Sequence, residues 1–66
     1  MRRYKVECAY THKDWNGKEA RCTEGFFSHT PDEAERECME YIEREGYEVT
    51  RIIGTWVETD NYWASV

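Results

Sequence analysis

The sequence predicts a small α+β domain of two layers, in which one acidic helix packs on one face of an antiparallel sheet in the order ββαβ(β). Residues 3–12 alternate with the period of a half-buried strand, and residues 30–46 carry the start, stripe and stop signals of a helix. Residues 47–58, after the helix, have the composition of a further long strand. Because 66 residues suit a single core, we expect one domain over residues 1–66.

The first two predicted strands form a hairpin. Within residues 3–12 the side chains that point to the core are Tyr4, Val6, Cys8 and Tyr10, and those that point away are Arg3, Lys5, Glu7 and Thr11. Asn16-Gly17 predicts the turn because both residues tolerate positive φ. The second strand covers residues 20–29. Its register is ambiguous because Phe26 and Phe27 face opposite sides, and Gly25 is a candidate bulge position.

Residues 31–45 are predicted to be helical. Thr30 is the expected N-cap, Pro31 takes the first helical position, and Glu33 completes a capping box. Gly46 is a natural stop. One apolar stripe at helical period should face the sheet, formed by Ala34, Cys38, Tyr41 and Ile42.

Residues 47–58 are predicted to form a long third strand, in which Gly54 marks a bend or a close approach of the backbone. Residues 59–61 form a turn, and residues 62–66 can add a short fourth strand. One helix covers only one face of such a sheet. The other face is therefore expected to be polar or to be paired with a partner.

The negative charge lies in the helix. The predicted helix holds seven carboxylates and two arginines, whereas the remaining residues hold seven acids and seven bases. The whole net charge of −5 therefore belongs to the helical segment. Direct binding to DNA or RNA is disfavoured, because affinity for phosphates needs a basic surface.

Three cysteines, Cys8, Cys22 and Cys38, occur at wide spacing. No apolar signal segment follows Met1 and no run is long enough to span a bilayer, so we expect a cytoplasmic protein with free thiols and no membrane contact. A Cys8–Cys22 bond is possible in one strand register. No C-x-x-C or H-x-x-H spacing exists, so we expect neither a metal nor a cofactor.

Catalytic chemistry is not indicated by any spacing in the chain. His12 and His29 fall near opposite ends of paired strands, and no nucleophile, base and orienting group are selected together. There is no phosphate-binding glycine loop. We therefore expect a non-enzyme. Stacking of RNA bases on exposed rings is a weaker option than core packing, with Trp15, Phe27, Trp56 and Trp63 as its candidates.

A helical wheel sorts the acids by direction. Glu35 and Glu37 lie on the flanks, and Asp32–Arg36 and Glu40–Arg44 are expected i,i+4 pairs. Carboxylates three or four residues apart lie about 5–6 Å apart, close to the spacing of successive phosphates. The acids either form an ordinary solvated face or bind a basic nucleic-acid-binding protein. The predicted partner-binding residues are Asp32, Glu33, Glu35, Glu37, Met39, Glu40 and Glu43.

In format the chain resembles the small phage-encoded anti-CRISPR proteins. The likeness lies in the hairpin around WNGKE, the helix PDEAERECMEYIEREG and the strand EVTRIIGTWVE, and it spans nearly the whole chain. The resemblance implies a non-enzymatic inhibitor in the cytoplasm of a bacterial host cell. Its partner would be a Cas effector subunit, with a type I surveillance complex as the expected target, and it would block the binding of target DNA.

Members of that group share no site motif, so the resemblance implies no site residue, and the site residues above come from the helical wheel alone. An alternative remains open, in which the chain is an acidic interaction module that homodimerises through the open face of its sheet. The expected state in solution is therefore a monomer or a weak homodimer.

Overall fold

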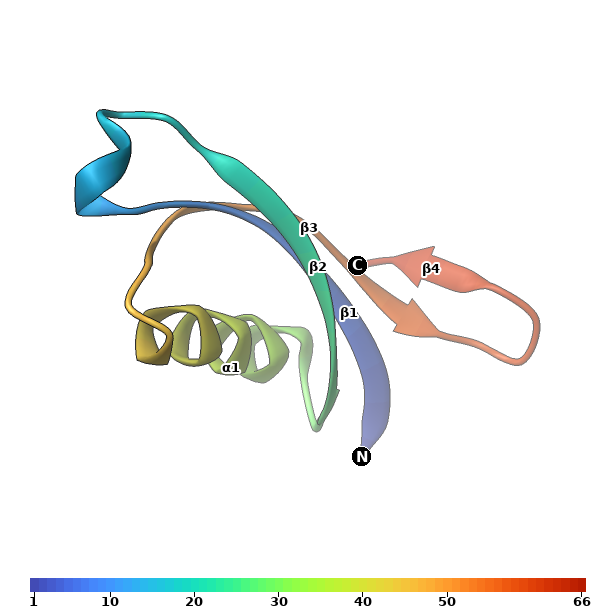
Figure 1. The fold of residues 1–66 in the computed structure, drawn as a ribbon. Helices are drawn as coiled ribbons and strands as arrows, with labels where there is room; N and C mark the ends of the chain where they lie inside the picture. Colours follow the sequence, from blue (N-terminus) through green and yellow to red (C-terminus); the bar gives the residue numbers. More distant parts are fainter.

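A computed structural model describes all 66 residues and shows a four-stranded antiparallel sheet with one helix packed on it. The elements are β1 (Arg2–Thr11), a 3₁₀ turn (Lys13–Trp15), β2 (Ala20–Ser28), α1 (Pro31–Arg44), β3 (Glu48–Glu58) and β4 (Trp63–Ser65). The strand order is β2-β1-β3-β4, and the sheet curves around α1 (Figure 1). The predicted α+β fold, including the short fourth strand, is confirmed.

The connection between β1 and β2 is longer than a two-residue turn. Asn16 and Gly17 have φ values of 54° and 84°, as the Asn-Gly pair predicts, but they follow the 3₁₀ turn. Trp15 from this tip packs on Tyr10 and Tyr47, with ring centroids 5.8 and 5.4 Å away. These contacts tie the hairpin tip to the segment that follows α1.

The register of the sheet corrects the prediction for Gly25. β1 and β2 pair without interruption from Arg2–Ser28 to Tyr10–Ala20, so Gly25 hosts no bulge. The two irregularities lie instead between β1 and β3, where the pairing shifts after Glu7 and again after Ala9. Extra residues on β3 increase its bend and twist locally, which lets this strand follow the curved sheet.

Capping residues define both ends of α1. The Thr30 hydroxyl accepts a hydrogen bond from the Glu33 N–H at 3.1 Å, although the reciprocal bond of a full capping box is absent. At the other end Gly46 has φ of 94°, and its N–H donates to the Glu43 carbonyl at 3.0 Å. The Tyr47 N–H donates to the Ile42 carbonyl at 3.3 Å, which completes a Schellman motif. The helix ends at Arg44, one residue before the predicted end.

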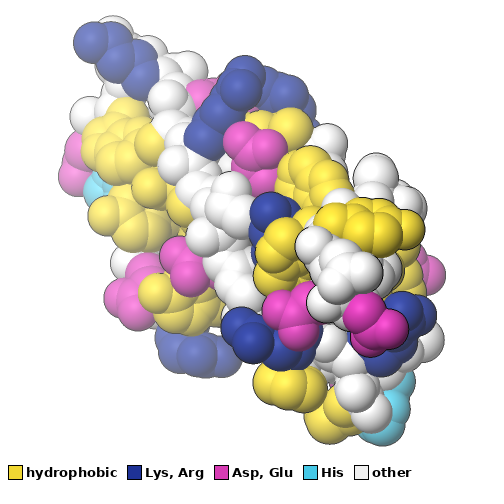
Figure 2. All heavy atoms as spheres, turned by 90° about the vertical axis from the view of Figure 1, so that its right-hand side faces the viewer, with side chains coloured by type: hydrophobic (Ala, Val, Ile, Leu, Met, Phe, Trp, Pro, Cys, Tyr) yellow, Lys and Arg dark blue, Asp and Glu magenta, His cyan; other side chains and the backbone are white.

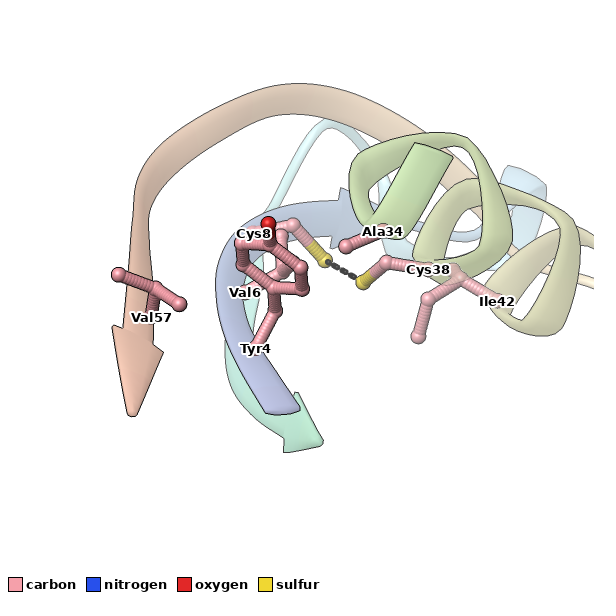
Figure 3. Packing of buried hydrophobic residues seen from close by; sticks show 7 residues of the cluster. All are labelled: Tyr4, Val6, Cys8, Ala34, Cys38, Ile42 and Val57. Carbon is pink, nitrogen blue, oxygen red and sulfur yellow. Dashed lines mark hydrogen bonds between the residues drawn. The ribbon is translucent and has the colours of Figure 1, made fainter. Parts of the chain in front are cut away.

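The core is a single cluster between α1 and the sheet (Figure 3). Tyr41, expected in the apolar stripe, is instead 37% exposed. At 100° per residue, Tyr41 lies about 60° from the centre of the stripe, and that is enough to turn its ring outward. The seven buried residues of the cluster are Tyr4, Val6, Cys8, Ala34, Cys38, Ile42 and Val57.

Gly54 allows a side chain to lie flat on the open face of the sheet, which is the face opposite α1. A Cβ built at Gly54 would stand 2.7 Å from the Cη2 atom of Trp56. The indole therefore occupies the space above the glycine backbone. This contact is the close approach that a glycine within a strand predicts.

We predict opposite effects for two alanine substitutions. Gly54→Ala should lower the free energy of unfolding by about 1 kcal/mol, because the crowding of Trp56 outweighs the conformational gain of replacing a strand glycine. At Gly25 the nearest atom to a new Cβ is 3.8 Å away, so Gly25→Ala should leave stability unchanged or raise it by about 0.5 kcal/mol. Urea unfolding followed by tryptophan fluorescence measures both. Equal shifts in the two variants would contradict the packing of Trp56.

Candidate functional site

The orientation of α1 distributes its acids over two flanks and an outer face. Because Ala34, Cys38 and Ile42 are buried against the sheet, residues on the opposite side of the helix point to solvent. Asp32, Glu40, Glu43 and Met39 are exposed, and the Glu33 side chain is half-buried. The structure therefore gathers five of the seven predicted partner-binding residues on or beside the outer face.

The two flanking acids also hold the helix on the sheet. Glu35 accepts a hydrogen bond of 2.7 Å from the Thr55 hydroxyl, and Glu37 accepts one of 2.8 Å from the Ser28 hydroxyl. Both hydroxyl residues are buried, so each bond satisfies a polar group that water does not reach. Glu35 and Glu37 thus have a structural role that the helical wheel did not predict.

The expected i,i+4 ion pairs of the helix are absent. No carboxylate of α1 lies within 4.0 Å of a basic nitrogen, and the pairs Asp32–Arg36 and Glu40–Arg44 do not form. Exposed pairs gain little Coulomb energy in water and restrict two long side chains, which explains their absence. The two ion pairs of the structure lie elsewhere, at Arg3–Glu58 and Arg51–Glu19, and the His12 Nδ1 atom beside Asp14 accepts a hydrogen bond from the Asp14 N–H.

The open face of the sheet carries aromatic and charged side chains together (Figure 2). Phe27 is 59% exposed, and the Arg3 guanidinium lies 6.0 Å from its ring centroid. The Lys5 ammonium lies 5.4 Å from the ring of Trp56 and 4.8 Å from that of Trp63, which are cation–π distances. Of the four aromatic residues considered for base stacking, only Trp15 lies elsewhere, in the cluster at the hairpin tip.

These contacts on the open face were not predicted from the sequence. Lys5 was assigned only to the outward side of β1, and Trp63 was assigned to a short final strand and to the candidates for base stacking. The glycine at position 54 was the available signal, because a residue without a side chain in a strand often marks a close neighbour. Between Phe27 and Trp63 lies a hollow of about 240 Å³, whose lining includes Arg3, Lys5 and Gly25.

The three cysteines meet in the core. Cys8 stands directly opposite Cys22 in the sheet with the two sulfurs 3.8 Å apart, and the Cys38 sulfur lies 3.9 Å from that of Cys8. All three are free thiols. Burial, with a further contribution from neighbouring thiols, raises the pKa of Cys8 and of Cys22 to about 11 and also raises the pKa of Cys38. No group of three His, Cys, Asp or Glu side chains has an arrangement that could hold a metal ion.

Comparison with known proteins adds no relative. No family model, curated protein or solved structure matches this chain. The helix of the structure is too short and too polar to cross a membrane.

We predict that the buried thiols make stability fall in alkaline solution. Their ordinary pKa is 9.0, and in the folded chain the pKa of Cys8 and Cys22 rises to about 11. Between these pH values the unfolded chain releases protons that the folded chain keeps, so the free energy of unfolding decreases as pH rises. Below pH 9 this contribution is fully present. Urea unfolding at intervals from pH 8 to pH 11 measures the slope.

The matched control carries Cys8→Ala and Cys22→Ala. This variant keeps every lysine and tyrosine, so it reports the slope that the other groups cause. The wild-type slope should be steeper. Identical slopes in the two proteins would mean that the thiols ionise as readily in the folded as in the unfolded chain. Thiol titration of the unfolded wild type should recover three thiols, and elemental analysis should find no stoichiometric zinc.

Proposed function

We propose that this chain is a non-enzymatic binding protein whose outer helix face docks on the basic, nucleic-acid-binding surface of another protein. The observation that carries the proposal is the unpaired charge of α1. Its carboxylates have no cation within 4.0 Å, although nine basic residues are present in the chain. The helix therefore offers an anionic surface that internal ion pairs do not neutralise.

Such a surface suits a basic groove on physical grounds. Glu33, Glu40 and Glu43 follow one another at intervals of seven and three positions, so they form a row on one side of the helix, in which the exposed Arg36 lies between Glu33 and Glu40. Because three carboxylates exceed one base, the row keeps a net negative charge, which raises the rate of encounter with a basic surface. Met39, 38% exposed, adds an apolar contact beside this row.

The partner that we propose is a Cas effector subunit in a bacterial host cell. The resemblance in format to small phage-encoded anti-CRISPR proteins supports this choice, and so does the acidic surface, because an effector holds target DNA in a positively charged channel. Occupation of that channel by α1 would exclude the DNA. Inhibition then requires no chemistry from this chain, only an affinity that competes with DNA.

A second candidate function is homodimerisation through the open face of the sheet. It is favoured by the exposed Phe27 and by the rings of Trp56 and Trp63, since aromatic residues and arginine are enriched in protein interfaces. Sedimentation distinguishes the two functions. If the mass doubles as the protein concentration rises, and the doubled mass is still observed in 1 M salt, the dimer is supported. Helix docking should instead weaken in 1 M salt, because the screening length falls from about 8 Å to about 3 Å.

We predict that reversing three outward charges abolishes docking. The variant Glu33→Lys, Glu40→Lys, Glu43→Lys replaces side chains that make no hydrogen bond or ion pair, so circular dichroism should report a folded protein. At about 1.5 kcal/mol for each lost charge contact, affinity for the effector should fall by roughly 1000-fold. Competition with labelled target DNA on a purified effector complex measures the loss.

The matched control reverses Glu7, Glu48 and Asp60, three acids outside α1 that also lack ion partners. It changes the net charge by the same amount. The control should lose less than tenfold in affinity. If both variants lose affinity equally, overall charge governs binding and the helix face is no specific site. If the helix variant inhibits as well as the wild type, the helix is an ordinary solvated face.

A further inference from the structure

The outer edge of β2 has no partner within the protein. β2 (Ala20–Ser28) pairs only with β1, and the sheet ends there. None of its backbone groups takes part in a turn or cap hydrogen bond, and no side chain bonds to them. Since neighbouring residues of a strand direct their N–H and C=O groups to opposite sides, about half of these groups face solvent.

Several common protections of a sheet edge are missing from this strand, although it carries two charged side chains, Arg21 and the inward-pointing Glu24. Natural edge strands are shortened, bulged, covered, or interrupted by proline or lysine. β2 runs for nine residues, contains neither proline nor lysine, and keeps an unbroken register with β1. The opposite edge differs, because β3 pairs irregularly and β4, with three residues, covers part of it.

The helix side of this edge is acidic. Glu24 lies on that side, because it stands opposite the buried Val6, and Glu37 is bonded to Ser28 at the end of the strand. Both glutamates are half-buried and neither has a basic partner within 4.0 Å. A cation brought to this side would therefore meet two partly desolvated carboxylates.

We infer that β2 accepts an extended basic segment of another protein as a fifth strand. The added strand would lie about 4.8 Å from β2 and satisfy its outward N–H and C=O groups. Alternate side chains of the segment would reach Glu24 and Glu37, so lysine or arginine belongs at those positions. The other side chains of the added segment would lie on the open face beside Thr23 and Phe27, where apolar or β-branched side chains fit.

A second copy of this chain is disfavoured as the occupant. Two β2 strands paired antiparallel are related by a twofold axis perpendicular to the sheet. Both acidic helices would then lie on the same side of one continuous sheet, where they repel. A basic segment would instead reduce the net negative charge on the helix side of the sheet. Its basic character rests on the proposed function, while the strand pairing rests on the backbone of β2.

The test uses the wild-type chain and a synthetic nine-residue peptide that alternates lysine or arginine with valine or threonine. Amide hydrogen exchange by NMR reports each N–H of β2. Binding should slow exchange at least tenfold at alternate residues of Ala20–Ser28 and leave the edge of β3 unchanged. A peptide with glutamine in place of the basic residues should bind at least tenfold more weakly, and a peptide N-methylated at alternate residues should not protect β2.

The protein-side variant is Glu24→Gln with Glu37→Gln, in which the new amide oxygen at position 37 can still accept the hydrogen bond from Ser28. This variant should bind the basic peptide at least tenfold more weakly than the wild type does, and its affinity for the glutamine peptide should be unchanged. Glu48→Gln with Asp60→Asn is the control with the same change in charge, at two exposed acids outside α1 that have no ion partner. Absence of peptide binding at millimolar concentration, or binding without protection of β2, would overturn the inference. Protection that appears with rising protein concentration and no peptide would assign the edge to a second copy.

This experiment is independent of the effector. The helix variant Glu33→Lys, Glu40→Lys, Glu43→Lys tests the proposed function by competition with DNA, whereas the peptide experiment reads the backbone of β2. If the helix variant competes with DNA as well as the wild type does, docking through the outer helix face is rejected. Strand addition still holds in that case if the basic peptide protects the N–H groups of β2.

Discussion

Close packing of a narrow helix stripe against β1 is the constraint on which the rest of the structure depends. Ala34, Cys38 and Ile42 meet Val6 and Cys8, and four of these five side chains are small. A helix that packs closely on a strand through small residues has little freedom to rotate about its own axis, because each buried contact fits only one orientation. That orientation decides which carboxylates reach the sheet and which reach solvent.

The sheet then separates two surfaces of different character. On the side of α1 the carboxylates outnumber the bases and form no ion pair. On the other side Arg3 and Lys5 lie close to aromatic rings, and Arg3 also pairs with Glu58 at 3.7 Å. The net charge of −5 therefore lies in α1 together with its C-cap residue Glu45. A partner that approaches the molecule meets a different electrostatic field from each side.

The carboxylates of α1 have two roles. Glu35 and Glu37 accept hydrogen bonds from the sheet, and those on the outer face point to solvent. Glu37 bonds to Ser28 in the last position of β2, and Glu24 stands on the same side without a partner. Side chains on the outer helix face attract a partner through charge, with the exposed Met39 as an apolar contact. The edge of β2 adds directed backbone groups, which give a bound segment a defined register.

Local signals determined most of the fold in advance, because the responsible interactions lie within a few residues. Thr30, Pro31 and Gly46 define the helix ends, and the alternation from Tyr4 to Tyr10 identifies the buried face of β1. The sequence by itself also located the net charge in the helix, since that needs only the helix boundaries. The register of β2, the outward turn of Tyr41 and the bonds from Thr55 and Ser28 to the flanking glutamates were decided by the tertiary structure. Each joins residues distant along the chain, so it depends on the curvature of the sheet and on the orientation of the helix, which no local pattern specifies.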